Sequence, residues 1–415
     1  MTDSHAIRLI SPAFANPKRL IRQLRHTIIH ICFQILYAFL RLLVPTNPKQ
    51  FGFLSHPDLS DNSLALFEKL LMAPYGDDYH LVWMVSNAST SRRDLRREFP
   101  NTDLRNVSVV TKHSLRGVWF SLRCRYIFTT HGGAWFGHSW HQQTLVNLWH
   151  GMPFKNFVAV GDKRDSFPMH FAIATSAYLA GIVAENFNLP RERVLITGQP
   201  RNEWLFQQEE RYFAVKEGRA KLVVWAPTFR RGCTDKTEIL EDGGANSPDP
   251  LSADRLTALD EMLEGAGTML VIKLHVMDIK NQQAWPSYRN IRIYTDPRFR
   301  TEGLNLYKLL ACSDALVTDF SSCVIDYLIL NKPIGLFAPD SSSYARGFIP
   351  GVFEKLATVA SELRSVAELA AFVSNLPPEH APTPEQELLY QMDLRSPSEA
   401  IMRAIGLPNP GSSMR

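Results

Sequence analysis

Short runs of apolar and β-branched residues alternate with helical patterns along most of this chain, and this alternation is the strongest constraint on its fold. Runs of this length are typical of buried strands, and the segments between them are long enough for crossover helices. We therefore expect an α/β fold with a parallel sheet covered by helices on both faces. The expected strands are 51–54, 81–85, 108–111, 126–129, 145–149, 171–174, 194–197, 222–225, 269–274, 291–294, 315–318 and 333–337. The expected helices are 63–71, 94–98, 114–123, 177–187, 253–263, 304–311 and 324–329, with a helical tail at 361–376 and 385–405.

The alternating pattern occurs in two halves. A Gly-Pro turn after the run at 194–197 looks like the join between them. With 415 residues, of which 45% are hydrophobic and 21% charged, the chain is expected to hold two globular domains and appendages. No sequence repeat accompanies the two halves, so only the architecture is repeated. Residues 233–250, which are rich in Asp, Gly, Ser and Pro, are expected to form a loop.

Charge and cysteine content exclude several classes of protein. The net charge is only +4, so the global charge does not indicate a nucleic-acid partner. The 5 cysteines are scattered and lack the CxxC spacing. They therefore argue against a disulfide framework or a zinc site, and fit a reducing cytosol.

The first 48 residues form a basic segment with a dense apolar pattern from Lys18 to Leu43. Its charge-free part, 27–40, is short of the roughly 20 apolar residues that a membrane span needs. We expect an amphipathic helix lying on an anionic membrane surface, with basic residues near the headgroups. A helix packed in the core and a true transmembrane anchor remain alternatives.

The segment from Asp314 to Pro333 predicts a strand, a hydroxyl-rich turn and a helix. Asp319 ends the apolar run, and Ser321 or Ser322 can cap the helix that follows. Such a turn brings hydroxyls and backbone N–H groups together at the carboxyl edge of a sheet, where anionic ligands bind. An ordinary capped helix is the alternative interpretation.

Other predicted strands also end in polar or basic residues. His150 follows 145–149, Arg230 and Arg231 follow 222–225, and His275 follows 269–274. Together these residues predict a cleft in which histidine and arginine face a multiply charged anion. A histidine such as His150 can act as a general base near neutral pH. A structural role for each histidine, and a solvated loop for the arginine pair, remain alternatives.

Five motifs follow one another along the chain. They are Trp-His-Gly-Met-Pro-Phe-Lys at 149–155, Thr-Gly-Gln-Pro-Arg-Asn at 197–202, Ala-Pro-Thr-Phe-Arg at 226–230, Ile-Lys-Leu-His at 272–275, and Val-Thr-Asp-Phe-Ser-Ser at 317–322 with Asn-Lys-Pro at 331–333. In this order they resemble the motifs of the CDP-glycerol glycerophosphotransferase family, which includes the teichoic-acid primases and polymerases and their capsule-polymer relatives. A Ser-Asp-Asn sequence at 60–62 also looks like an early motif of that family. The resemblance covers roughly residues 50–375.

The resemblance implies a GT-B-like fold, in which two Rossmann-like domains face each other across a cleft. The chain would then consist of a membrane-associating segment at 1–48, an acceptor domain at 49–195, a CDP-donor domain at 196–375 and a helical tail at 376–415. It also implies peripheral attachment to the cytoplasmic face of the bacterial inner membrane. This attachment agrees with the basic amphipathic segment.

Carried over position by position, the resemblance assigns roles to individual residues. His150 becomes the base, and His275 becomes a catalytic residue at the donor pyrophosphate. The donor-binding residues would be Thr228, Arg230, Lys273, Asp319, Ser321 and Ser322, and further cleft residues Gly151, Lys155, Gly198, Arg201 and Asn202. The sequence departs from the family pattern at Gln199, Phe229 and Val276, where tyrosine, tryptophan and proline are common.

The expected reaction moves glycerol phosphate from CDP-glycerol to a hydroxyl of a lipid-linked or polymeric glycan and releases CMP. No acidic pair with metal-ligand spacing lies near these motifs, so neither an obligatory metal nor another cofactor is expected. An enzyme of the same fold that uses CDP-ribitol or a nucleotide sugar is one alternative. A non-catalytic partner of a polysaccharide assembly complex is the other.

Overall fold

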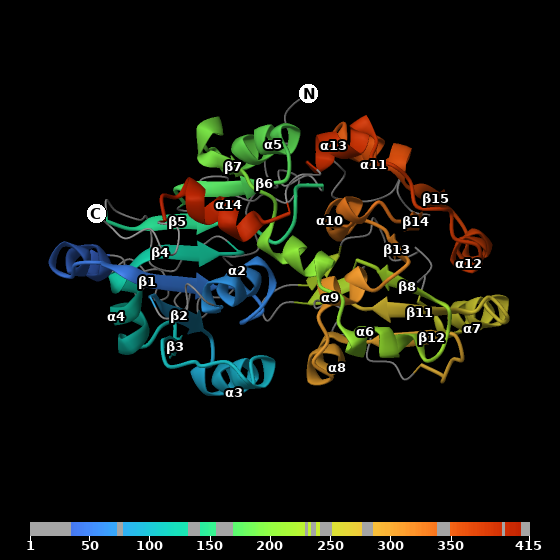
Figure 1. The fold of residues 1–415 in the computed structure, drawn as a ribbon, viewed down its shortest axis with the longest axis horizontal. Coiled ribbons are helices and arrows are strands. Elements are labelled where there is room, and N and C mark those ends of the chain that lie inside the picture. The colour runs from blue at the N-terminus through green and yellow to red at the C-terminus, as the bar shows by residue number, and fades with distance from the viewer. Residues whose placement is uncertain are drawn as a thin grey trace, which may run out of the picture.

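The computed structural model describes residues 35–72, 78–131, 142–154, 169–228, 231–233, 238–240, 251–275, 285–337, 349–391 and 395–407. Most of the predicted membrane-associating segment, 1–34, lies outside these ranges. The described residues form two α/β halves that lie side by side (Figure 1). The predicted fold class is confirmed, because each half is built on a parallel sheet flanked by helices.

The first half contains a 7-stranded sheet in the order β3-β2-β1-β4-β5-β6-β7. Every neighbouring pair in it is parallel. Strands β2 and β4 are buried almost throughout, and β1 is buried at 50–53, which explains why these segments read as continuous apolar runs. The strands are β1 (Asn47–Leu54), β2 (His80–Val85), β3 (Val107–Thr111), β4 (Cys124–Thr129), β5 (Thr144–Asn147), β6 (Phe171–Ala174) and β7 (Val194–Ile196).

Three helices of this half begin at polar side-chain caps that the sequence supplies. Asn87, Ser114 and Ser176 each accept a hydrogen bond from a backbone N–H of the first helical turn. The helices of this half are α2 (Asp61–Leu71), α3 (Ala88–Glu98), α4 (Leu115–Arg123) and α5 (Ala177–Phe187). A 3-10 helix, η5 (Pro200–Phe206), follows the Gly-Pro turn and leads to the second half.

The second half contains a 6-stranded parallel sheet in the order β12-β11-β8-β13-β14-β15. Its strands are β8 (Lys221–Ala226), β11 (Thr268–Lys273), β12 (Ile291–Tyr294), β13 (Ala315–Thr318), β14 (Ile334–Phe337) and β15 (Ser361–Leu363). Its helices are α6 (Glu210–Phe213), α7 (Ala253–Met262), α8 (Asp296–Thr301), α9 (Leu306–Ala311), α10 (Cys323–Tyr327), α11 (Val352–Val359) and α12 (Val366–Ser374).

The carboxyl ends of the two sheets face each other. In Figure 1 the arrows of β1 and β4 point toward the second half, and the arrow of β11 points toward the first. One cluster of buried apolar side chains includes residues of both halves, such as Phe53, Leu148 and Ile325. The halves are therefore joined by apolar packing as well as by the chain.

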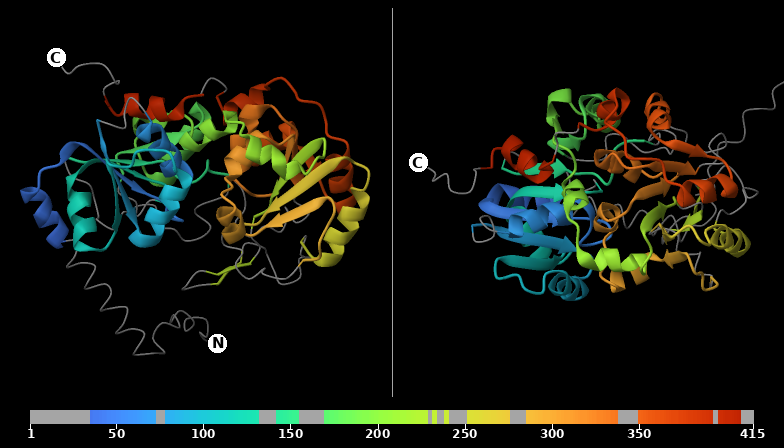
Figure 2. Two further views of the ribbon diagram at one scale, coloured as in Figure 1. Left: turned by 60° about the horizontal axis from the view of Figure 1, so that its bottom comes forward. Right: turned by 45° about the vertical axis from the view of Figure 1, so that its right-hand side comes forward.

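The tail crosses back from the second half to the first (Figure 2). Helix α13 (Pro384–Leu389) packs on α5, and α14 (Pro397–Ala404) packs on α2. The hydroxyl of Thr175 donates to the carbonyl of Leu389 (2.7 Å), and that of Ser176 donates to Leu388 (2.6 Å). The tail thus connects the halves a second time.

Three secondary-structure predictions were wrong. The segment 385–405 is not helical throughout, because it holds two helices, α13 and α14, and residues 390–391 and 395–396 between them are not helical. The segment 361–376 is not helical throughout, because it opens with strand β15 on the edge of the second sheet. The expected loop at 233–250 holds part of a short antiparallel pair, β9 (Arg231–Cys233) with β10 (Glu238–Leu240). These three strands are each three residues long, and each depends on pairing with another strand, so none of them has a periodic apolar pattern.

Residues 35–43 form a helix that packs against α4 through Tyr37. The buried Tyr37 hydroxyl donates to Ser121 Oγ at 2.9 Å. Among the described residues, no helix is long and apolar enough to cross a membrane.

Candidate active site at the facing sheet edges

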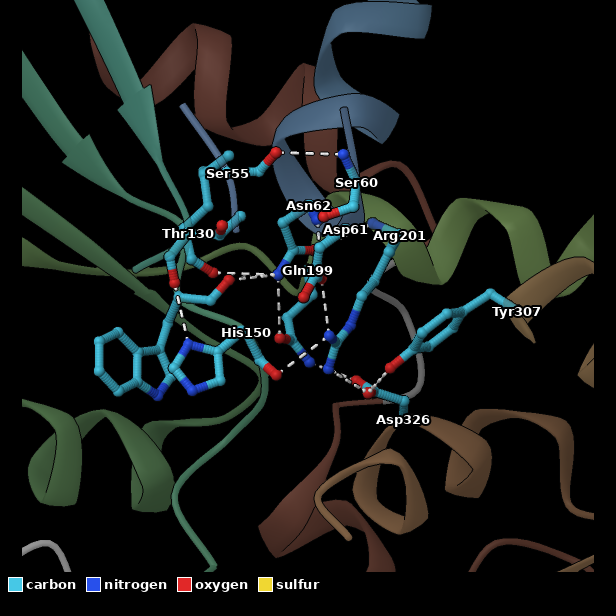
Figure 3. Close-up of polar contacts among 12 residues, drawn as sticks. Ser55, Ser60, Asp61, Asn62, Thr130, His150, Gln199, Arg201, Tyr307 and Asp326 are labelled. Carbon is cyan, nitrogen blue, oxygen red and sulfur yellow. Dashed lines mark hydrogen bonds and ion pairs between the residues drawn. The ribbon is translucent and has the colours of Figure 1, made fainter. Parts of the chain in front are cut away.

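His150 lies directly beyond β5, at the carboxyl edge of the first sheet. Trp149 adopts a left-handed backbone conformation (φ 49°), and its N–H donates to Asn147 Oδ1 at 2.9 Å. His150 Nδ1 lies 3.0 Å from the carbonyl oxygen of Thr130 (Figure 3). Because a carbonyl oxygen only accepts, Nδ1 carries the proton. In the neutral ring, Nε2 therefore holds the lone pair that a general base needs.

Gly151 brings this loop against the hydroxyl-rich turn of the second half. Its φ is +142°, and a Cβ placed there would lie 1.9 Å from Ser322 Oγ and 2.7 Å from Ser322 Cβ. Only glycine fits a position with this backbone and this neighbour. The structure thus brings together two predicted groups, His150–Gly151 and Ser321–Ser322, from opposite sheets.

Asp319 holds the turn of β13 against the loop after β8. Its carboxylate accepts from the backbone N–H of Thr228 (2.8 Å), from the Thr228 hydroxyl (2.9 Å) and from the N–H of Phe320 (2.6 Å). Asp319 and Thr228 are both buried. These contacts fix two adjacent strand ends relative to each other.

The expected capping of the next helix by a serine hydroxyl is not observed. Ser322 occupies the N-cap position of α10, yet its backbone is helical and its side chain makes no capping hydrogen bond. Helix α10 spans only Cys323–Tyr327 and continues as a 3-10 turn at Leu328–Leu330.

His275 and Lys273 lie at the end of β11, the strand next to β8. Lys273 Nζ donates to Asp296 Oδ1 (2.9 Å) and to the carbonyl of Leu274 (2.7 Å). Burial lowers the pKa of Lys273, and the Asp296 carboxylate opposes that effect. Lys273 therefore ties the strand end to α8, two residues before His275.

Arg201 is buried between the halves. Its guanidinium pairs with Asp61 Oδ1 of the first half and with Asp326 Oδ2 of the second, both at 2.7 Å, and Arg201 is 4% exposed. Burial alone lowers the pKa of Arg201, but the carboxylates of Asp326 and Asp61 outweigh it and hold that pKa well above its usual range. Arg201 also donates to the carbonyl of His150 (3.1 Å), so the ion pairs adjoin the His150 loop.

Amides and hydroxyls complete this contact (Figure 3). Asp326 accepts from Asn202 Nδ2 (2.9 Å), from the Tyr307 hydroxyl (2.6 Å) and from Gln199 Nε2. Asn62 donates to the carbonyls of Leu148 (3.0 Å) and Trp149 (2.9 Å), just before His150. Gly198, which has a positive φ of 76°, donates its N–H to Ala174.

Sequence reasoning missed three residues of this region, Tyr307, Asp326 and His131. Asp326 sits on the apolar helix 323–327, and Tyr307 on another apolar helix, so neither follows a strand. For His131 the one available signal was its position two residues after β4. Polar residues that follow parallel strands meet at one edge of the sheet, so this position could have marked His131 as a neighbour of His150.

Two predicted site residues, Lys155 and Arg230, lie outside the described residues. Within the described part of the chain, no group of three or more His, Cys, Asp or Glu side chains is placed to hold a metal ion.

Two parallel sheets with facing carboxyl edges define a GT-B-like protein. Residues 36–376 match the model of the CDP-Glycerol:Poly(glycerophosphate) glycerophosphotransferase family, and the chain belongs to this family. The family resemblance of the sequence motifs is thereby confirmed.

Comparison with individual proteins gives more distant matches. The chain is 24% identical to a teichoic acid poly(glycerol phosphate) polymerase of Bacillus spizizenii, over 82% of this chain and 86% of that protein. It is 29% identical to a teichoic acid poly(ribitol-phosphate) polymerase of the same species, over 51% of this chain and 36% of that protein. A solved structure of the wall teichoic acid polymerase TagF superposes with a TM-score of 0.69 at 20% identity, covering 93% of this chain and 97% of the other. This likeness shows the fold.

Proposed function

We propose that the protein transfers glycerol phosphate from CDP-glycerol to a hydroxyl of a lipid-linked or polymeric glycan, with release of CMP. The match of residues 36–376 to the glycerophosphotransferase family carries this proposal. The product would belong to a teichoic-acid-like or capsule polymer. The ribitol-phosphate polymerase among the relatives makes CDP-ribitol the second candidate donor.

His150 is the proposed base. Its Nε2 would take the proton of the acceptor hydroxyl while that oxygen attacks the β-phosphorus of CDP-glycerol. A new phosphorus–oxygen bond forms to the acceptor, the bond to the bridging oxygen breaks, and CMP leaves with the electron pair. The Nδ1 contact to Thr130 supports this role, because it places the lone pair of the neutral ring on Nε2.

The donor pyrophosphate would be held from the second half by His275, Arg230, Ser321 and Ser322. Hydrogen-bond donors at these positions stabilise negative charge on the leaving phosphate. Thr228 and Asp319 would act by fixing the turn, as their mutual hydrogen bonds suggest. Lys273 would act by holding the end of β11 through Asp296.

The division into an acceptor domain at 49–195, a donor domain at 196–375 and a tail at 376–415 is part of the proposal. Arg201 and Asn202 would hold these halves together, because both side chains are buried on Asp326. Gly151, Lys155 and Gly198 would shape the loops that face the substrates.

The donor is tested by supplying purified protein with CDP-glycerol, CDP-ribitol or UDP-glucose and a glycerol-phosphate primer. We expect CMP to be released with CDP-glycerol, and the primer to gain glycerol-phosphate units in its mass spectrum. Release of CMP with CDP-ribitol alone would identify CDP-ribitol as the donor and would leave the fold assignment unchanged. If no donor leads to CMP release, the protein would be better explained as a non-catalytic partner of a polysaccharide assembly complex.

Helix 35–43 supports peripheral attachment to the anionic cytoplasmic face of the bacterial inner membrane. It exposes five large apolar side chains, Ile35, Leu36, Phe39, Leu42 and Leu43. The adjacent α4 exposes Leu115 and Trp119 beside Arg116. Apolar side chains flanked by arginine suit an interface with anionic lipid.

Replacing both Phe39 and Leu42 with glutamate is expected to lower binding to phosphatidylglycerol vesicles at least tenfold. The substitutions remove apolar area that would enter the lipid and add charges that anionic headgroups repel. Cosedimentation of the full chain measures the effect. Met262→Glu is a matched control, since Met262 is 50% exposed on α7 of the other half. Unchanged binding of the double variant would refute this attachment site.

A further inference from the structure

Three histidines follow the ends of three adjacent strands in the first sheet. His56 follows β1, His131 follows β4 and His150 follows β5, and these strands are neighbours in the order β1-β4-β5. Because the strands are parallel, all three side chains start from one edge of the sheet. Only His150 has a role in the proposed reaction.

The rings of His131 and His150 are stacked. Their centroids are 4.3 Å apart and their planes differ by 10°. The ring of His56 is nearly perpendicular to the ring of His131, with centroids 5.6 Å apart and planes at 84°. The Trp149 ring also lies close to the His150 ring, with centroids 4.2 Å apart and planes that differ by 34°. His150 is thus bounded by two aromatic rings from its own loop and from the neighbouring strand end.

Thr130 connects the two stacked histidines. Its carbonyl accepts the Nδ1 proton of His150 (3.0 Å), and its hydroxyl lies 2.8 Å from Nδ1 of His131. The hydrogen bond to the carbonyl fixes where Nδ1 points, but a ring held at one atom can still tilt about that bond. The face of His131 limits this tilt, because the His150 ring cannot turn into the space that the stacked His131 ring occupies.

His131 is suited to lie beside a base that becomes positively charged. The pKa of His131 is lowered to about 3, mainly by burial and then by the nearby His150. The other groups acting on it are Asp61, which raises this pKa, and His56 and Arg201, which lower it. His131 is therefore neutral at physiological pH and does not repel an imidazolium on His150.

We propose that His131 is a positioning residue for the transfer reaction: its ring holds the His150 imidazole in the orientation from which Nε2 accepts the proton of the acceptor hydroxyl. This inference rests on the proposed role of His150 as the base. His131 itself transfers no proton and touches neither reacting atom. Its effect on the rate arises because small errors in the placement of a catalytic group can lower a rate about 100-fold.

The test compares three substitutions of His131 in the full chain, using CMP release from CDP-glycerol with a glycerol-phosphate primer. We expect His131→Ala to lower kcat about 10- to 100-fold and to leave KM for CDP-glycerol within about threefold. His131→Phe keeps a ring in the stack and should retain kcat within about threefold. His131→Asn keeps a polar group without the stack and should behave like alanine.

A double-mutant cycle separates positioning from a general structural role. If His131 acts only through His150, then adding His131→Ala to His150→Ala should not lower the residual rate further. The matched control is His80→Ala. His80 hydrogen-bonds to Ser108 Oγ (2.9 Å) and packs on Phe120, but it lies at the amino end of β2, the opposite edge of the same sheet. It should leave kcat within about threefold.

Three results would overturn this inference and leave the role of His150 intact. The first is a normal kcat for His131→Ala, and the second is a loss on adding His131→Ala to His150→Ala that equals the loss in the wild-type background. Loss of activity in His131→Phe equal to that in His131→Ala would also overturn it, because the ring would then not be what matters. A normal rate for His150→Ala would remove both the base assignment and the role of His131.

Discussion

Replacing Arg201 with methionine is expected to lower the free energy of unfolding by about 3–5 kcal/mol, the range for removing one partner from a buried ion pair. The Arg201 side chain is 5% exposed and that of Asp326 is 0% exposed. The substitution leaves the Asp326 charge buried without a cation, and it also deprives Asp61 of its partner. Urea denaturation followed by tryptophan fluorescence measures the change.

The same substitution should impair catalysis as well as stability. Arg201 links Asp61 of the first half to Asp326 of the second, and it donates to the carbonyl of His150. Without it, the loop carrying His150 and the turn carrying Ser322 lose a common anchor. We therefore expect kcat to fall even at temperatures where the variant remains folded.

Arg298→Met provides the matched control. Arg298 also pairs with a carboxylate, Glu302, at 2.8 Å, but the two side chains are 56% and 40% exposed. Exposed pairs of this kind contribute at most about 1 kcal/mol. A loss below about 1 kcal/mol for Arg201→Met, equal to the control, would contradict the structural role assigned to the buried pair.

Much of the fold could be predicted because the strands are short, apolar and buried. The predicted ranges 171–174, 291–294 and 315–318 agree with β6, β12 and β13 at both ends. Parallel strands covered on both faces leave an uninterrupted apolar signal in the sequence. Strand β15 leaves no such signal, because only Leu363 of its three residues is buried and the pairing with β14 determines its conformation.

The candidate site was predictable where its residues follow strands. His150, His275 and Asp319 were predicted in this way, and the structure places each beyond a strand end. The Arg201 contacts were not predictable, because its partners Asp61 and Asp326 are 140 and 125 residues away in sequence. Local pattern carries no information on such pairs, and only the packing of the two halves brings them together.

Replacing His150 with alanine is expected to lower kcat about 100- to 10,000-fold, the usual contribution of a general base. The substitution removes the Nε2 lone pair that would accept the acceptor proton. It leaves the contacts on the donor side, such as Asp319 with Thr228, unchanged. Binding of CDP-glycerol, measured by calorimetry, should therefore remain within about threefold of the wild type, which shows that the loss is chemical.

The most direct test of the account is acceptor-dependent CMP release from CDP-glycerol by wild-type protein and by His150→Ala. We predict release by the wild type that requires the primer, and its loss in the variant despite normal donor binding. Release by the variant at a rate within about threefold of the wild type would contradict the central claim, because the proposed base would then have no part in the reaction.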